Sequence, residues 1–171
     1  SSDLMHPTGP TTRHPYTAQK EEVTVTTSLQ TSSRVFSLHQ SPLALPTTIP
    51  AVFRAAARLI VANGHYQGDY VPDAFDRRTT TPHAERPMSI VAAIRCVTSP
   101  HGDNPHRITE LSESAVKVLA GRLEVDGEPA WNDEPHHLEG HVAHWGDVEG
   151  RTVESVVAVL EAAADANEVS A

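Results

Sequence analysis

The stretch that decides the fold is HWGDVEGRT (residues 144–152), which runs directly into VESVVAVLEAA (residues 153–163). The second segment repeats small apolar residues at helical spacing and predicts a last helix from Val153 to about Ala164. The first segment predicts a tight polar loop that contains one of the two tryptophans. Threonine is a preferred residue at helix N-termini, so we expect Thr152 to cap this helix.

Two roles are open for this loop. In the first, the loop is structural: Arg151 pairs with Asp147, and Trp145 covers the edge of the core. In the second, Arg151 and the start of the last helix receive an anionic ligand, because helix N-termini attract negative charge. A Gly-Arg-Thr sequence specifies no such ligand by itself, so the structural role is favoured.

The segment before the loop is rich in histidine. If residues 136–145 form a helix, three imidazoles lie on one narrow stripe, and these belong to His137, His141 and His144. Imidazoles one turn apart are typical ligands of Zn²⁺ or Ni²⁺, and Asp133, Glu139 or Asp147 could add an oxygen ligand. The spacing matches no established zinc motif, and Gly140 weakens the helix. The alternative is that these histidines are ordinary surface residues.

A third polar segment, HYQGDY, covers residues 65–70. Its histidine, aromatic and carboxylate side chains, His65 and Tyr66 first among them, could line a ligand pocket. Alternatively, its glycine only shapes the chain while the tyrosines pack.

Apolar periodicity predicts further helices over residues 50–63 and 108–122, and a short helix is also expected over residues 136–145. Residues 88–97 are apolar nearly all round, which predicts a buried helix starting at Pro87 or, alternatively, a buried strand. We expect residues 76–87 to be polar and exposed, and a turn at residues 126–127. The expected fold is therefore mainly α, a compact bundle of four or five short helices in a domain from residue 48 to 165. A frayed tail over 166–171 would follow it.

Residues 1–47 differ from this domain in being rich in Ser, Thr and Pro. They predict a flexible or extended arm, although alternating residues over 23–29 and a second run over 34–39 also fit a β-hairpin. An arm of this kind could dock on a second copy of the chain, so a homodimer through this arm is one expectation.

Composition indicates which binding partners and which cellular compartment to expect. With 13 basic and 22 acidic residues the net charge is −9, which disfavours nucleic acid. The sequence contains no run of about 18 apolar residues, so we expect no membrane span. Its one cysteine, Cys96, lies among apolar residues and is expected to be buried. A single cysteine and the lack of a secretory signal pattern favour the cytoplasm.

The order of three motifs resembles an uncharacterised family of small actinobacterial and actinophage proteins, grouped as a domain of unknown function. The motifs are GHYQG (64–68), SIVAAI (89–94) and WGD followed by GRT (145–152). That family is characterised by a C-terminal W-N-D-x-x-G-R-T-x-x-E-V pattern. In this chain Gly146 stands where the pattern has Asn, and Ser155 where it has Glu. The resemblance covers about residues 52–163 and implies a helical domain but no activity.

The sequence carries no serine-hydrolase signature, phosphate-binding glycine loop or dinucleotide fingerprint. The leading hypothesis is therefore a small cytoplasmic binding or accessory protein without catalysis and without a required cofactor. The rival is a Zn- or Ni-dependent enzyme or metal-binding protein that uses the histidines of residues 136–144. Whether the protein is an enzyme stays open at this point.

Overall fold

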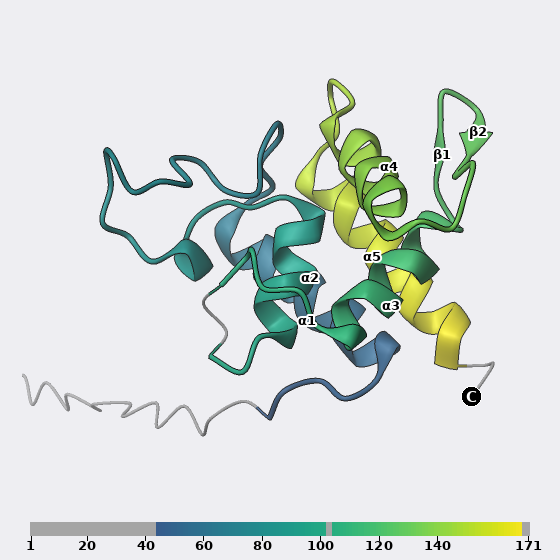
Figure 1. Cartoon of the computed structure of the whole chain (residues 1–171), viewed down its shortest axis with the longest axis horizontal. Coiled ribbons are helices and arrows are strands. Elements are labelled where there is room, and N and C mark those ends of the chain that lie inside the picture. The colour runs from purple at the N-terminus through teal and green to yellow at the C-terminus, as the bar shows by residue number, and fades with distance from the viewer. Residues whose placement is uncertain (1–43, 102–103, 169–171) are drawn as a thin grey trace, which may run out of the picture. The chain divides into compact units, whose positions relative to one another are not determined.

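The computed structural model describes residues 44–101 and 104–168 of the chain. In this part the elements follow in the order α1 (Ile49–Asn63), the 3₁₀-helix η1 (His83–Glu85), α2 (Ile90–Thr98), α3 (Glu110–Ala120), β1 (Glu124–Val125), β2 (Glu128–Pro129), α4 (Pro135–Asp147) and α5 (Val153–Glu168) (Figure 1). The predicted mainly α bundle is thereby confirmed. The expected hairpin over residues 23–39, and most of the expected arm, lie outside the described residues.

Hydroxyl side chains cap the starts of α1, α2 and α3. The Thr48 hydroxyl accepts a hydrogen bond from the backbone N–H of Ala51 at the start of α1, and α3 opens with a capping box between Thr109 and Ser112. Such caps satisfy N–H groups that the helix itself leaves unpaired. The predicted start of α2 at Pro87 is wrong, because the hydroxyl of Ser89 caps that helix and Ile90 is its first residue.

The bundle is built around α1, α2 and α5. Helix α1 packs along α5 and against α2, while α3 packs against α4. Buried alanines allow α1 and α5 to lie close together, and they are Ala56, Ala57, Ala163 and Ala164. As predicted, α2 is a helix buried in the middle of the fold, and Cys96 is buried within it.

The C-terminal elements differ from the prediction at their ends. Residues 145–147 are helical and form the last turn of α4, so the predicted loop is shorter than expected. Helix α5 continues to Glu168, because Arg54 of α1 forms ion pairs with Asp165 (2.8 Å) and Glu168 in that last turn. The prediction of a frayed tail from residue 166 is therefore wrong for residues 166–168.

A short hairpin joins α3 to α4. Strands β1 and β2 pair antiparallel around Asp126 and Gly127, both of which have positive φ. Positive φ at both central residues is what a type I′ hairpin turn requires, and Asp-Gly is a favoured pair there. The predicted turn is confirmed, whereas the two strands beside it were not predicted.

The connection from α1 to α2 is ordered by one buried cation. Arg86 is 4% exposed, and its guanidinium donates to backbone carbonyls of Pro72, Asp73 and Thr81. It also donates to the carboxylate of Asp76, at 2.5 Å. The expectation that the whole of residues 76–87 is exposed is therefore wrong, since Arg86 forms the buried centre of this loop.

Asp73 gives the same loop a second anchor. Its carboxylate accepts hydrogen bonds from the backbone N–H groups of Arg77, Arg78 and Thr79. These bonds, the one from Arg78 foremost, hold the pKa of the Asp73 carboxyl below its ordinary value. The guanidinium of Arg86 likewise lowers the pKa of Asp76.

Across the described residues, no helix has both the length and the apolar character needed to span a bilayer.

Candidate functional site

The segment after α4 fixes the start of the last helix. The Arg151 guanidinium lies 3.6 Å from the centroid of the Trp145 ring and donates to the Trp145 carbonyl, at 3.1 Å. Trp145 is buried, and Thr152 accepts a hydrogen bond from Ser155 N–H at 3.2 Å, which confirms the predicted cap. The predicted pair between Arg151 and Asp147 is wrong: Asp147 instead accepts a bond from the backbone N–H of Gly68, at 2.9 Å.

The HYQGDY segment docks on the end of α4. His65 Nε2 lies 3.0 Å from the Gly146 carbonyl oxygen, and the Gln67 amide donates to the carbonyls of Gly146 (3.1 Å) and Val148 (2.9 Å). On its other side the segment is bonded to the residues before α2, with Tyr66 N–H donating to the Met88 carbonyl at 3.0 Å. His65 and Tyr66 thus connect α2 to α4, and neither lines the hollows described below.

A charged network lies between α2, α4 and this segment. The side chain of Arg95, 7% exposed, donates to Glu139 across 2.5 Å. The Tyr70 hydroxyl donates to the other carboxylate oxygen of Glu139, and the Arg95 guanidinium lies 5.0 Å from the centroid of the Tyr70 ring. Burial, followed by the bond to Glu139, raises the pKa of Tyr70. Sequence reasoning assigned no site role to Arg95, whereas Tyr70 belongs to the HYQGDY segment that was expected to line a pocket.

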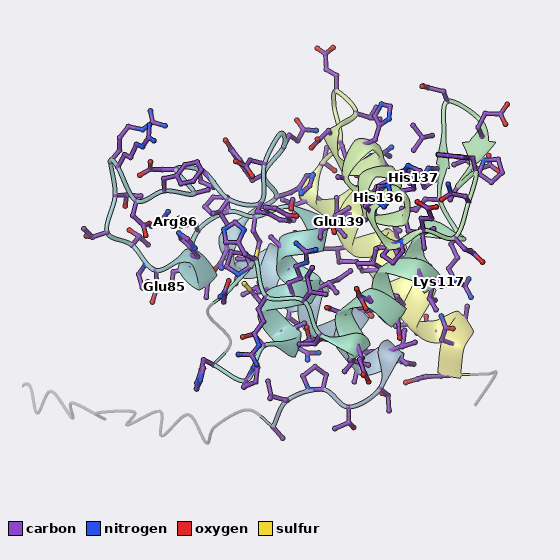
Figure 2. The ribbon with its side chains drawn as sticks, viewed as in Figure 1. Glu85, Arg86, Lys117, His136, His137 and Glu139 are labelled. Carbon is purple, nitrogen blue, oxygen red and sulfur yellow. The ribbon has the colours of Figure 1, made fainter. Side chains whose placement is uncertain are left out.

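Two hollows meet at Glu139. The first, of about 410 Å³, lies between α3 and α4, with an apolar wall that includes Ile108, Val116 and Leu138. An ion pair between Lys117 and Asp133 (3.2 Å) borders it (Figure 2).

The second hollow, of about 320 Å³, lies between residues 68–70 and α4. Asp69, Glu139 and Asp147 give it three carboxylates, while no lysine or arginine of the described chain borders it. Glu139 and His136 line both hollows, so the two form one candidate binding region.

The predicted histidine stripe faces a third hollow, of about 500 Å³, between the hairpin and α4. His137, His141 and His144 all line it. Their nitrogen atoms do not converge, however, because His141 Nε2 is bonded to the Leu123 carbonyl at 3.0 Å. Asp133 is paired with Lys117 instead of facing the stripe.

A different histidine group does converge. Over the described residues, the group of three potential metal ligands whose donor atoms all lie within 4.8 Å of one another is Glu134, His136 and His137. Only His137 is shared with the predicted metal set. The predicted ligand set left out His136, which lies off the i, i+4, i+7 stripe on which that prediction rested, and Glu134, which precedes the expected helix.

The fold and this arrangement define a compact helical domain of unestablished activity. The chain belongs to a family of unknown function, DUF6197, whose model matches residues 44–166. A comparison with curated proteins and one with solved structures gave no match. The family match agrees with the expected resemblance to an uncharacterised domain, while the actinobacterial origin and the C-terminal pattern stay predictions.

Proposed function

We propose that this chain is a small binding protein without catalysis of its own, and that the two hollows around Glu139 take a small organic cation with an apolar body. The observation that carries this proposal is the position of Glu139, which borders both hollows and is held in place by Arg95 and Tyr70. A carboxylate fixed from two sides gives a binding region a rigid wall.

Size and charge support this ligand class. The two volumes fall in the range of small-molecule sites, and the apolar wall between α3 and α4 suits a hydrocarbon or aromatic body. Asp69 and Asp147 add negative charge beside Glu139, and no lysine or arginine of the described residues lines that hollow. The aromatic ring of Tyr70 adds a surface that attracts cations.

The partners of Glu139 favour binding over catalysis. A general base needs a carboxylate oxygen that can reach a substrate proton. In Glu139 one oxygen accepts from Tyr70 and the other from Arg95. Its role in this proposal is therefore to form a fixed wall of the binding region, while Asp69 and Asp147 supply the negative charge that attracts a bound cation.

The proposal can be tested with three matched probes: 2-phenylethylamine, its neutral analogue 2-phenylethanol, and the anion phenylacetate. We expect the amine to raise the melting temperature and to bind most tightly by calorimetry. Asp69→Asn should weaken amine binding severalfold, whereas Glu149→Gln removes the same charge from an exposed loop outside the hollows and should not. Equal binding of all three probes, or equal effects of the two variants, would contradict the proposal.

A cytoplasmic location and a homodimer formed through residues 1–47 stay predictions from the sequence. Light scattering on the full chain and on a variant that starts at Pro46 tests the homodimer. The prediction requires a dimer that is lost on removing the arm.

A further inference from the structure

We propose that Glu134, His136 and His137 form a zinc site at the start of α4. Their donor atoms all lie within 4.8 Å of one another. His136 also lines all three hollows, so a metal ion held there would face the binding region (Figure 2). This inference is independent of the ligand class proposed above.

The distances are close to those of a real site. His136 Nε2 lies 3.6 Å from Glu134 Oε2, and His137 Nδ1 lies 4.0 Å from the same oxygen. Tetrahedral zinc with bonds of about 2.0–2.1 Å places neighbouring donor atoms roughly 3.3–3.4 Å apart. Because Glu134 and His136 are exposed, small side-chain rotations can close the remaining gap without moving the backbone.

Neighbouring aromatic rings limit how far the imidazoles can turn. The rings of His136 and His137 are 4.0 Å apart between centroids, and the Trp131 ring lies 4.3 Å from that of His137. These ring contacts, tilted by 51° and 39° between planes, keep both imidazoles beside Glu134 before any ion binds. Restrained ligands lose less conformational freedom on binding a metal.

Asn132 competes with zinc for the Nδ1 atom of His137. Its Nδ2 lies 2.5 Å from His137 Nδ1 and donates to the lone pair that zinc would use, while its Oδ1 accepts from the backbone N–H of Glu134 at 3.0 Å. Asn132→Asp keeps the acceptor for Glu134 but replaces the donor by a carboxylate. This variant should therefore bind zinc more tightly than the original chain.

The ligand set also indicates the kind of site. The start of a helix carries partial positive charge, which opposes a cation, so the carboxylate of Glu134 is essential to offset it. Two imidazoles and one carboxylate leave a fourth zinc position for water or for a ligand atom. The site is thus an open one, and not a closed structural site with four protein ligands.

The test uses the full chain without a histidine tag, freed of metal by a chelator and titrated with zinc chloride against a chromophoric zinc indicator. We expect one equivalent to bind, and Glu134→Gln, His136→Ala and His137→Ala each to weaken binding at least about tenfold, since each removes one of three ligands. Circular dichroism should be unchanged for the exposed Glu134 and His136 variants, which separates ligand loss from unfolding.

His144→Ala is the matched control, since it removes an exposed histidine from the same helix outside the triad. It should leave zinc affinity within about twofold, as expected of a non-ligand. Binding of less than about a tenth of an equivalent would overturn the inference, because a site with three such ligands fills readily. The same holds if His144→Ala weakens binding as much as His136→Ala, in which case the stripe of His137, His141 and His144 would be the site.

Discussion

His65 Nε2 lies 3.0 Å from the carbonyl oxygen of Gly146, and this contact joins two residues that are 81 positions apart in the chain. The last carbonyls of a helix have no partner within the helix and need one from elsewhere. At the end of α4 the side chains of His65 and Gln67 supply it. The HYQGDY segment is therefore the C-terminal cap of a helix that lies far away in the sequence.

Replacing His65 by alanine should destabilise the fold by about 2 kcal/mol, because the variant loses a hydrogen bond and leaves a gap under Gly146. The free energy of unfolding from urea titration measures this cost. Faster hydrogen exchange is expected at Gly68, whose N–H is bonded to Asp147. His144→Ala, on an exposed face of α4, should stay within about 0.5 kcal/mol of the original chain. Equal losses in the two variants would contradict this account.

The two glycines of α4 should respond in opposite directions to an added side chain. A Cβ at Gly140 meets no atom within 4 Å, so Gly140→Ala should stabilise the chain by about 0.5–1 kcal/mol through helix propensity. A Cβ at Gly146 would lie 3.3 Å from Ile90 Cδ1 and 3.5 Å from His65 Cε1. Gly146→Val should therefore destabilise it by about 1–3 kcal/mol. Urea midpoints that move in the same direction for both variants would refute this explanation.

Arg86→Ala should release the loop that precedes α2, because several backbone carbonyls and the Asp76 carboxylate lose their common donor. Limited trypsin digestion reports this directly, since the exposed Arg77 and Arg78 are cleavage sites within the same loop. We expect cleavage there to become at least about tenfold faster, as local opening grows more frequent. Arg58→Ala, on the exposed face of α1, serves as the control and should leave the cleavage rate unchanged.

The same loop should make stability fall in acid. The carboxyl pKa values of Asp73 and Asp76 are lower in the folded chain than their ordinary values. At a pH between the folded and the ordinary pKa, the unfolded chain therefore binds more protons than the folded chain. The free energy of unfolding contributed by these groups is therefore fully present above their ordinary pKa and is lost as the pH falls below about 4. Urea midpoints between pH 7 and pH 3 should fall less steeply for Asp76→Asn. An unchanged slope would show that Asp76 contributes nothing.

Much of the fold was predictable because it depends on local signals. Apolar periodicity located α1, α3 and α5, the all-round apolar run of residues 88–97 located α2, and Thr152 was expected as a cap on the basis of residue type alone. The ends of α4 and α5 were placed wrongly, since both depend on distant partners. The last turn of α4 is held by His65 and Gln67, and the last turn of α5 is paired with Arg54.

The candidate site was less predictable than the fold. Spacing placed three histidines on one face of α4, but whether imidazoles converge depends on neighbours such as the Leu123 carbonyl, which holds His141. One signal was nevertheless present in the sequence: Arg95 is the only charged residue within the apolar run of residues 88–97. A cation in a buried helix requires an anionic partner, so Arg95 pointed to a buried carboxylate, although not to Glu139 in particular.

The pairing of the first helix with the last has a consequence for synthesis of the chain. The ion pair between Arg54 and Glu168 spans 114 residues, and α5 is the element against which α1 packs most extensively. At a translation rate of roughly 5–20 residues per second, α1 waits on the order of 5–20 s on the ribosome before its main partner emerges. During that time its apolar face is open to chaperones. Nascent chains that stop short of α5 should therefore remain protease-sensitive, and the domain should acquire resistance in one late step.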